Sequence, residues 1–158
     1  MKKIITGGTI VTATDTYKAD VLIEDGILQQ IALSIQDEEA EVIDASGKLL
    51  FPGGIDPHTH LDMPFNNTVT DDDWESGTIA AAFGGTTTII DFCISAGSPT
   101  LMDAIETWHS KSKDKAVIDY GFHLMIGDLN EQRLKELPEA LDKCGISSIK
   151  VFLAYAKE

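Results

Sequence analysis

Two histidines separated by one residue are the first feature of this chain that could do chemistry. They lie in the segment "PGGIDPHTHLDMP", where His58 and His60 are two of only 4 histidines in 158 residues. In a strand, residues i and i+2 point to the same face, about 6.5–7 Å apart, so the two imidazoles would project together. Nitrogen–metal distances of about 2.0–2.1 Å allow two such rings to converge on one divalent cation. Paired histidines can also be purely structural, so the spacing alone leaves both interpretations open.

A lysine inside an apolar strand is the second such feature. Lys150 lies in "SSIKVFLAY", which is otherwise apolar on both faces. An ammonium buried without a partner is costly, so the side chain would pair with a buried carboxylate or extend its amine to solvent. Desolvation could instead remove its proton. A neutral amine can take up CO₂ as a carbamate, which is an anionic ligand with two oxygens. The residues around Lys150 do not select among these alternatives.

The elements that must position these side chains change in character at Pro52. Before it, short apolar runs indicate strands. Two of them surround the hairpin signal Asp25-Gly26, and further strands are predicted at 2–6, 9–13, 41–43 and 48–51.

After Pro52, strands and helices alternate. Strands are predicted at 55–60, 86–92, 117–126 and 148–155, and helices at 70–84, 99–113 and 131–143. The spacing of Thr70 and Asp73 predicts a capping box for the first helix.

This alternation predicts an α/β fold with a parallel sheet. A complete (β/α)₈ barrel takes about 250 residues, whereas residues 52–158 hold four predicted strands. We therefore expect the first half of a TIM-type barrel in the front portion of a longer protein; a small open sheet is the alternative. Active sites of such barrels lie at the carboxyl ends of the strands, where His58 and His60 are predicted. That placement favours the metal interpretation.

Composition narrows the class of partner. A net charge of −14 argues against nucleic-acid and anionic-membrane surfaces, which attract basic patches. The sequence contains no run of eighteen apolar residues that could span a membrane. Its N-terminal apolar stretch is too short for an export signal. We therefore expect a cytoplasmic protein in which Cys93 and Cys144 are buried, reduced thiols.

Four segments in order resemble the dihydropyrimidinase / D-hydantoinase family of cyclic amidohydrolases. They are "PGGIDPHTHLDMPF", "AAFGGTTTIIDF", "VIDYGFHLM" and "GISSIKVFLAY", and the hairpin segment "ADVLIEDGILQQI" matches as well. The resemblance implies that the chain is the N-terminal portion of such an enzyme. Residues 1–51 would then be the N-terminal strands of a small β-sandwich, and 52–158 the first four strands of the (β/α)₈ barrel. Members of this family are commonly homotetramers or dimers.

The resemblance also implies roles for individual residues. His58 and His60 match ligands of the more buried of two metal ions, and Lys150 matches a carboxylated lysine that bridges both ions. Tyr155 matches a catalytic tyrosine that contacts the substrate carbonyl and its developing oxyanion. Hydrophobic residues near the exocyclic group of the substrate are matched by Met63, Phe65 and Phe152. The family's remaining ligands, two histidines and an aspartate, are absent from these 158 residues, so the isolated chain is expected to be inactive.

The implied reaction is metal-dependent hydrolysis of the cyclic amide bond in dihydropyrimidines or 5-substituted hydantoins. Two divalent ions, zinc or manganese, would hold a bridging hydroxide that opens the ring to an N-carbamoyl amino acid. One alternative is a non-catalytic scaffold like the collapsin response mediator proteins, which have lost metal ligands that are present here. Another is a dihydroorotase or allantoinase. Dihydroorotases carry arginine where this chain has Asp62, which would repel a substrate carboxylate.

Three other polar residues have structural interpretations. His109 is predicted to be a solvated helix residue. His123, on the third barrel strand, is interpreted as a satisfied core histidine in preference to a polar group of the barrel interior. Asp56 shares the parity of the histidine pair, so it could orient one of the rings or serve only the main chain at the start of the strand.

Overall fold

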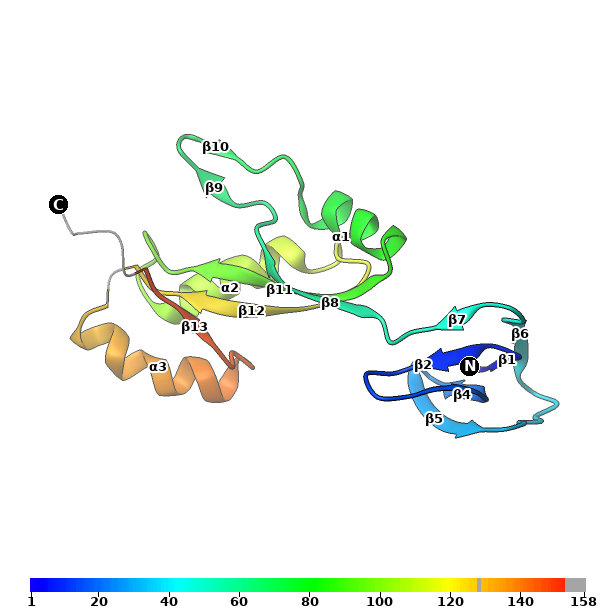
Figure 1. Cartoon of the computed structure of the whole chain (residues 1–158). Coiled ribbons are helices and arrows are strands. Elements are labelled where there is room, and N and C mark those ends of the chain that lie inside the picture. Colours follow the sequence, from blue (N-terminus) through cyan, green and yellow to red (C-terminus); the bar gives the residue numbers. More distant parts are fainter. Residues whose placement is uncertain (128, 153–158) are drawn as a thin grey trace. The chain divides into compact units, whose positions relative to one another are not determined.

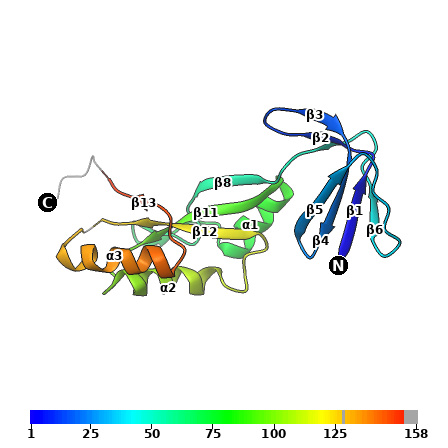
Figure 2. The same cartoon turned by 90° about the horizontal axis from the view of Figure 1, so that it is seen from below.

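The computed structural model describes residues 1–127 and 129–152. The chain divides into two compact units, Met1–Pro52 and Gly53–Glu158. Figures 1 and 2 show the elements of both units from two directions. Each unit is described by itself.

The first unit contains two small sheets. The larger has the order β5-β4-β1-β6 and the smaller the order β3-β2-β7. The strands of the larger sheet are β1 (Lys2–Thr6), β4 (Asp20–Glu24), β5 (Ile27–Ala32) and β6 (Glu41–Asp44). Those of the smaller sheet are β2 (Thr9–Val11), β3 (Thr16–Lys18) and β7 (Leu49–Leu50).

The hairpin predicted at Asp25-Gly26 joins β4 to β5. Both residues have positive φ, +50° and +80°, as the tight turn between twisted strands requires. Strand β3 was not predicted, because its residues Thr16–Lys18 are all exposed and show no apolar alternation.

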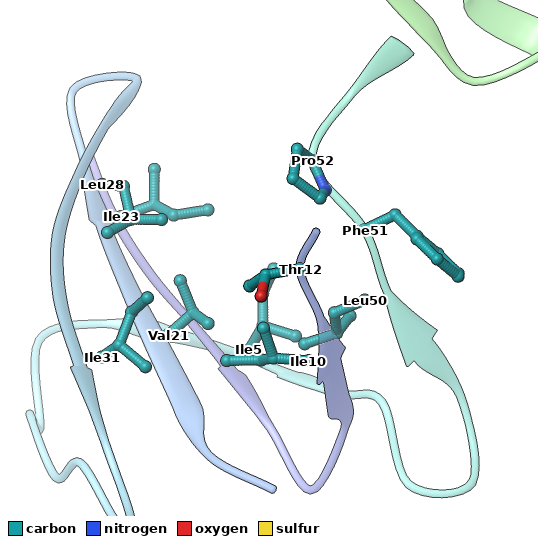
Figure 3. A pocket seen from close by; sticks show the side chains of 10 residues that line it. All are labelled: Ile5, Ile10, Thr12, Val21, Ile23, Leu28, Ile31, Leu50, Phe51 and Pro52. Carbon is teal, nitrogen blue, oxygen red and sulfur yellow. The ribbon is translucent and has the colours of Figure 1, made fainter. Parts of the chain in front are cut away.

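Side chains from both sheets line one apolar groove, of about 280 Å³ (Figure 3). The larger sheet contributes Ile5, Val21 and Ile23, and the smaller one contributes Ile10 and Leu50. Ile10 and Val21 are buried members of the small core of this unit. The groove therefore gives the two sheets a shared apolar face, while their assignment to a β-sandwich stays a prediction.

The second unit is built on a parallel sheet of the order β13-β12-β11-β8. Each of its three strand pairings is parallel, as the alternation of strands and helices predicted. The strands are β8 (Gly54–Thr59), β11 (Thr86–Ile94), β12 (Asp119–Met125) and β13 (Ile149–Lys150). The connecting helices are α1 (Trp74–Phe83), α2 (Leu101–Ser112) and α3 (Glu131–Lys143), which lie along one face of the sheet in Figure 2.

The core of this unit lies between the sheet and those helices. Buried members include Trp74 of α1, Ile89 of β11, Ile105 and Trp108 of α2, and Leu124 of β12. The opposite face of the sheet carries the candidate site, where His58 is exposed and Lys150 is half-buried. None of the three helices in the described part of the chain is both long and apolar enough to cross a membrane.

The start of α1 differs from the prediction. The helix begins at Trp74, and its N-cap is Asp73, whose carboxylate accepts from the Ser76 backbone N–H while the Ser76 hydroxyl bonds back. Thr70 lies before the helix, where its hydroxyl accepts from the Met63 N–H at 2.9 Å. The Thr70–Asp73 capping box is therefore wrong by one turn, because the Thr70 hydroxyl bonds the Met63 main chain across the β9–β10 hairpin.

The segment after His60, for which neither a strand nor a helix is predicted, contains a short hairpin. Its strands are β9 (Pro64–Phe65) and β10 (Thr68–Val69), joined by Asn66 and Asn67 at φ of +45° and +66°. Asparagine tolerates the left-handed region, so the Asn-Asn pair was a turn signal that the prediction passed over.

The remaining elements of this unit agree in kind with the prediction. Helix α3 spans the predicted residues, and Gly145 follows it at φ of +66°. Of the strand predicted at 148–155, the structure describes residues up to 152, and within these the strand is Ile149–Lys150. Tyr155 lies outside the described residues.

Candidate functional site

The histidine pair lies at the carboxyl end of an edge strand. His58 belongs to β8 and His60 follows that strand directly. The ring centroids lie 5.2 Å apart at an interplanar angle of 80°. Both rings contact Phe92 of β11, with centroids 4.7 and 4.9 Å away. The prediction that the two side chains share one face of the sheet is therefore confirmed.

Lys150 reaches the same ring from the opposite edge of the sheet. It ends β13, and its Nζ lies 4.0 Å from the Phe92 centroid and 5.3 Å from that of Phe152. Both contacts have the geometry of a cation over an aromatic face. Lys150 is half-buried and forms no ion pair within residues 1–127 and 129–152. The salt-bridge alternative for this lysine therefore has no support from the described residues.

A hollow of about 580 Å³ lies over this part of the sheet. Its lining side chains come from three strands and the residues around them: Pro57, His58, Phe92, His123, Ser148, Ile149, Lys150 and Val151. The chemistry-bearing residues of β8 and β13 thus open onto one space.

The environment of His60 favours its neutral form. Burial lowers the pKa of this imidazole, and the charge of Lys150 lowers it further, while Asp91 opposes both effects. Its Nδ1 is buried and has no hydrogen-bond partner in the described structure. A buried ring nitrogen in that condition is destabilising unless something else engages it. A neutral imidazole is also the form that binds a metal ion, so both observations fit a ligand role.

Asp91 is the functional candidate that sequence reasoning missed. It lies in β11, is fully buried, and accepts from the Thr59 hydroxyl and the Leu61 N–H, each at 2.8 Å. Burial raises the pKa of this carboxyl, and these hydrogen bonds oppose the shift. Thr59 and Leu61 flank His60, so holding them to one side of the strand directs the histidines to the other. The signal was available, because "IIDF" places a carboxylate in an apolar strand just as "SIKVF" places an amine.

Three more contacts fix the chain around the histidines. Asp62 adopts a positive φ of +51°, and its carbonyl accepts from Lys111 Nζ at 2.6 Å. A Cβ on Gly77 of α1 would lie 2.4 Å from Leu61 Cδ2, so the helix packs closely on this loop. The Asp56 carboxylate accepts from the His58 backbone N–H at 3.0 Å. Of the two interpretations of Asp56, the structure supports the one in which it serves the main chain.

The other histidines have clear surroundings. His123 has partners at both ring nitrogens, Ser148 Oγ and the Pro57 carbonyl, so it is satisfied as predicted. It is half-buried on the open face of the sheet, however, and not in the core. His109 is exposed on α2, as predicted, and its ring lies 5.0 Å from that of Phe122.

The cysteines do not extend the site. Both are free; Cys93 is buried and Cys144 is half-buried, so the prediction that both are buried is wrong for the second. Burial raises the pKa of the Cys93 thiol to about 12. A thiol held in that state is a poor nucleophile and a poor metal ligand.

The side chains predicted to touch substrate are only partly brought together. Phe152 is 46% exposed and adjoins Lys150. Met63 is half-buried beside the β9–β10 hairpin, and Phe65 lies in β9, 59% exposed. No described contact joins Met63 or Phe65 to the histidine pair. Tyr155 belongs to the residues beyond the described structure.

The described residues provide only part of a metal centre. Among them, no three His, Cys, Asp or Glu side chains gather closely enough to hold an ion. A catalytic zinc ion takes three protein ligands, of which this surface offers two imidazoles. The amine of Lys150 could supply the third only as a carbamate. The donor set therefore fits a metal with additional ligands, and the metal roles of these residues stay predictions.

Comparison with known proteins gives consistent matches. A model described as the amidohydrolase family matches residues 41–144. A D-hydantoinase of Geobacillus stearothermophilus is 63% identical over 155 residues, which cover 98% of this chain and 33% of that protein. A dihydropyrimidinase of Dictyostelium discoideum is 42% identical over 153 residues, covering 96% of this chain and 30% of that protein. This chain thus spans about a third of the length of the curated relatives it matches.

Solved structures show the same similarity in three dimensions. A D-hydantoinase crystal structure superposes with a TM-score of 0.95 at 62% identity, over 99% of this chain and 34% of that one. A dihydroorotase superposes with a TM-score of 0.62 at 16% identity, over 95% of this chain and 42% of that one, which shows likeness of fold alone.

Proposed function

This chain belongs to the amidohydrolase family, and on that premise we propose that the whole protein hydrolyses the cyclic amide bond of dihydropyrimidines or 5-substituted hydantoins. The products are N-carbamoyl amino acids. The observation that carries the proposal is the meeting of His58, His60 and Lys150 over the ring of Phe92. Relatives named D-hydantoinase and dihydropyrimidinase, matched over nearly the whole of this chain, support the substrate class.

The two imidazoles and the lysine would hold a pair of divalent metal ions. His58 would present a nitrogen from β8 and His60 one from the position after that strand, and Lys150, as a carbamate, would present two oxygens from the end of β13. Zinc and manganese both accept such a ligand set. When bound, the ions would supply a reactive hydroxide at neutral pH and polarise the amide carbonyl. Because burial lowers the pKa of His60, its neutral form, the one that binds a metal ion, is favoured.

Other residues of the chain would bind and orient the substrate. The Tyr155 hydroxyl is proposed to donate a hydrogen bond to the carbonyl oxygen as it gains negative charge. Met63, Phe65 and Phe152 are proposed to surround the exocyclic substituent of the ring. The exposure of Phe65 and Phe152 supports this, because both offer apolar surface that a ligand could cover.

The proposal extends to the architecture of the whole protein. Residues 1–51 would be the N-terminal strands of a small β-sandwich, and 52–158 the first half of a (β/α)₈ barrel. Among the described residues, β8 and β13 are the edge strands of the sheet and each is unpaired on one side, which supports a sheet that continues. Exposed apolar residues on those edge strands, including Ile55 and Ile149, support it as well. A homotetrameric or dimeric assembly in the cytoplasm completes the proposal.

Turnover by the full-length protein tests this function. Purified protein loaded with zinc or manganese is assayed on dihydrouracil, on a hydantoin with an apolar 5-substituent, and on dihydroorotate. We expect ring opening of the first two and none of dihydroorotate, whose carboxylate Asp62 would repel. Turnover of dihydroorotate alone would assign the protein to the sister class, and no turnover of any of the three would favour a scaffold.

An assay of the isolated chain is a second test of the proposed function. Purified residues 1–158 are expected to open neither dihydrouracil nor hydantoin, because further ligands are required. Ring opening by that chain would mean that the active site has been placed wrongly.

A further inference from the structure

His123 of β12 lies in the hollow of the candidate site, yet the proposed reaction assigns it nothing. We propose that His123 is a positioning residue that ties β8 to β13, the two edge strands that carry the predicted metal ligands. This inference rests on the proposed function only for the role of those ligands. The tie itself is a property of the fold.

The imidazole bridges strands that do not pair with each other. In the sheet order β13-β12-β11-β8, strand β11 separates β12 from β8. His123 Nε2 nevertheless lies 2.9 Å from the carbonyl oxygen of Pro57, the residue before His58. Its Nδ1 bonds Ser148 Oγ, two residues before Lys150. One ring therefore contacts the main chain next to one predicted ligand and a side chain close to another.

The chemistry of the two partners assigns the tautomer. A carbonyl oxygen can only accept, so the proton of the neutral ring is on Nε2, which donates to Pro57. The lone pair of Nδ1 then accepts from the Ser148 hydroxyl. Both nitrogens are used, so His123 is not available as a metal ligand. The ring of Phe92, 5.0 Å away, packs against the imidazole and also contacts both other histidines of the site.

Within residues 1–127 and 129–152, the backbone pairing of the two edge strands is short or irregular, so a further link between them adds constraint. In that part of the chain, β13 pairs with β12 at two positions, Leu124↔Ile149 and Met125↔Lys150. The pairing of β8 with β11 is interrupted by two register shifts, the second between Ile89 and Asp91, opposite the end of β8. Metal ligands must be held within about 0.5 Å of their productive geometry. The hydrogen bonds of His123 to Pro57 and Ser148 restrict the relative position of these two strand ends, which their backbone pairing alone restricts poorly.

Hydrogen–deuterium exchange on the metal-free full-length protein tests the tie without requiring a bound ion. In His123→Phe, which keeps a ring and loses both hydrogen bonds, amides of residues 54–60 and 146–152 should exchange about threefold to tenfold faster. His123→Gln should restore slow exchange, because an amide carries a donor and an acceptor bonded to one carbon atom, as the neutral ring does. His109→Phe, the same change on exposed α2, should leave both segments unchanged.

A double-mutant cycle identifies the partner. Ser148→Ala should accelerate exchange in residues 146–152 of the otherwise wild-type protein and add nothing in the His123→Phe background. Because Ser148→Ala keeps the imidazole, it serves as the test if His123→Phe does not fold. In addition, zinc affinity measured against a competing chelator should fall about tenfold to a hundredfold in His123→Phe and recover in His123→Gln.

Three results would overturn the inference: unchanged exchange at both segments in His123→Phe, full additivity with Ser148→Ala, or His123→Gln as impaired as His123→Phe. A protein that shows the expected exchange pattern but binds neither zinc nor manganese would support the tie and refute the proposed function. Failure of the inference about His123 and failure of the proposed function can therefore be distinguished.

Discussion

The amine of Lys150 lies 4.0 Å from the centroid of the Phe92 ring. The same ring contacts His58 and His60, which reach it from the other edge of the sheet. An aromatic residue on an inner strand thus gathers the chemistry-bearing residues of two edge strands onto one face. A cation over an aromatic ring is stabilised without a carboxylate, so Lys150 keeps the freedom to take another partner.

The first prediction concerns the buried carboxylate behind the histidine pair. Asp91→Ala removes the acceptor for the Thr59 hydroxyl and the Leu61 N–H, leaving polar groups unsatisfied beside His60. We expect a loss of about 1–3 kcal/mol in the free energy of unfolding, measured by urea denaturation. Both donors bond one carboxylate oxygen, Oδ2, and the Phe92 N–H bonds the other, so Asp91→Asn should recover only part, because its NH₂ replaces an acceptor at one of these two positions. The exposed Asp71→Ala is the control, and equal stability of the two alanine variants would contradict the role given to Asp91.

The second prediction concerns protonation of His60 in the metal-free protein. Burial first, and then the charge of Lys150, lowers its pKa from the ordinary value of 6.5. NMR titration should therefore show a His60 pKa below 6.5, and Lys150→Met should raise it. Between the folded pKa and 6.5 the unfolded chain binds the proton and the folded chain does not, so stability is lost as the pH falls through that window. A His60 pKa at or above 6.5 in the wild-type protein would be inconsistent with this environment.

The third prediction concerns the glycine just before β8. A Cβ on Gly53 would lie 2.0 Å from Thr87 Oγ1 and 2.7 Å from Thr87 Cβ, next to the backbone of the neighbouring strand. Gly53→Ala should therefore cost about 1–3 kcal/mol, seen as a lower urea midpoint at unchanged slope. Gly121→Ala in β12, where nothing lies within 4 Å of the added Cβ, is the matched control and should be neutral or stabilising. Similar midpoints for the two variants would show that the approach of β8 to Thr87 is not close.

The fourth prediction concerns Lys150 as a bridging ligand. The full-length protein should bind about two divalent ions per subunit, and Lys150→Ala should lose most of them. Elemental analysis after gel filtration measures the content. Lys143→Ala, which removes an exposed amine paired with Glu139, is the control and should keep the full content. An unchanged metal content in Lys150→Ala would rule out the bridging role.

The sequence predicted the parts of the site that depend on local geometry. The shared face of His58 and His60 follows from the two-residue period of a strand, which holds in any sheet. The proximity of Lys150 to that pair depends on strand order, which alternation and family resemblance together indicated. The parallel sheet was predicted from the alternation of strands and helices.

Features that depend on contacts between different elements were missed. Thr70 and Asp73 both fit the start of a helix, but Thr70 bonds Met63 across the β9–β10 hairpin, through its hydroxyl and its backbone N–H. Asp91 lies in a run that predicted a buried strand, and its partners belong to β8 and the residues after it, so their identity required the pairing of β8 with β11. The two bonds of His123 likewise join residues distant in sequence.

A crystal structure of the full-length protein grown with zinc, with anomalous data at the zinc edge, tests the central claim most directly. The account predicts an anomalous peak about 2.0–2.1 Å from a nitrogen of His58 and of His60. It also predicts density for a carbamate extending from Lys150 Nζ toward the same peak. A zinc-free surface at the two histidines, or a Lys150 side chain directed away from them, would contradict it.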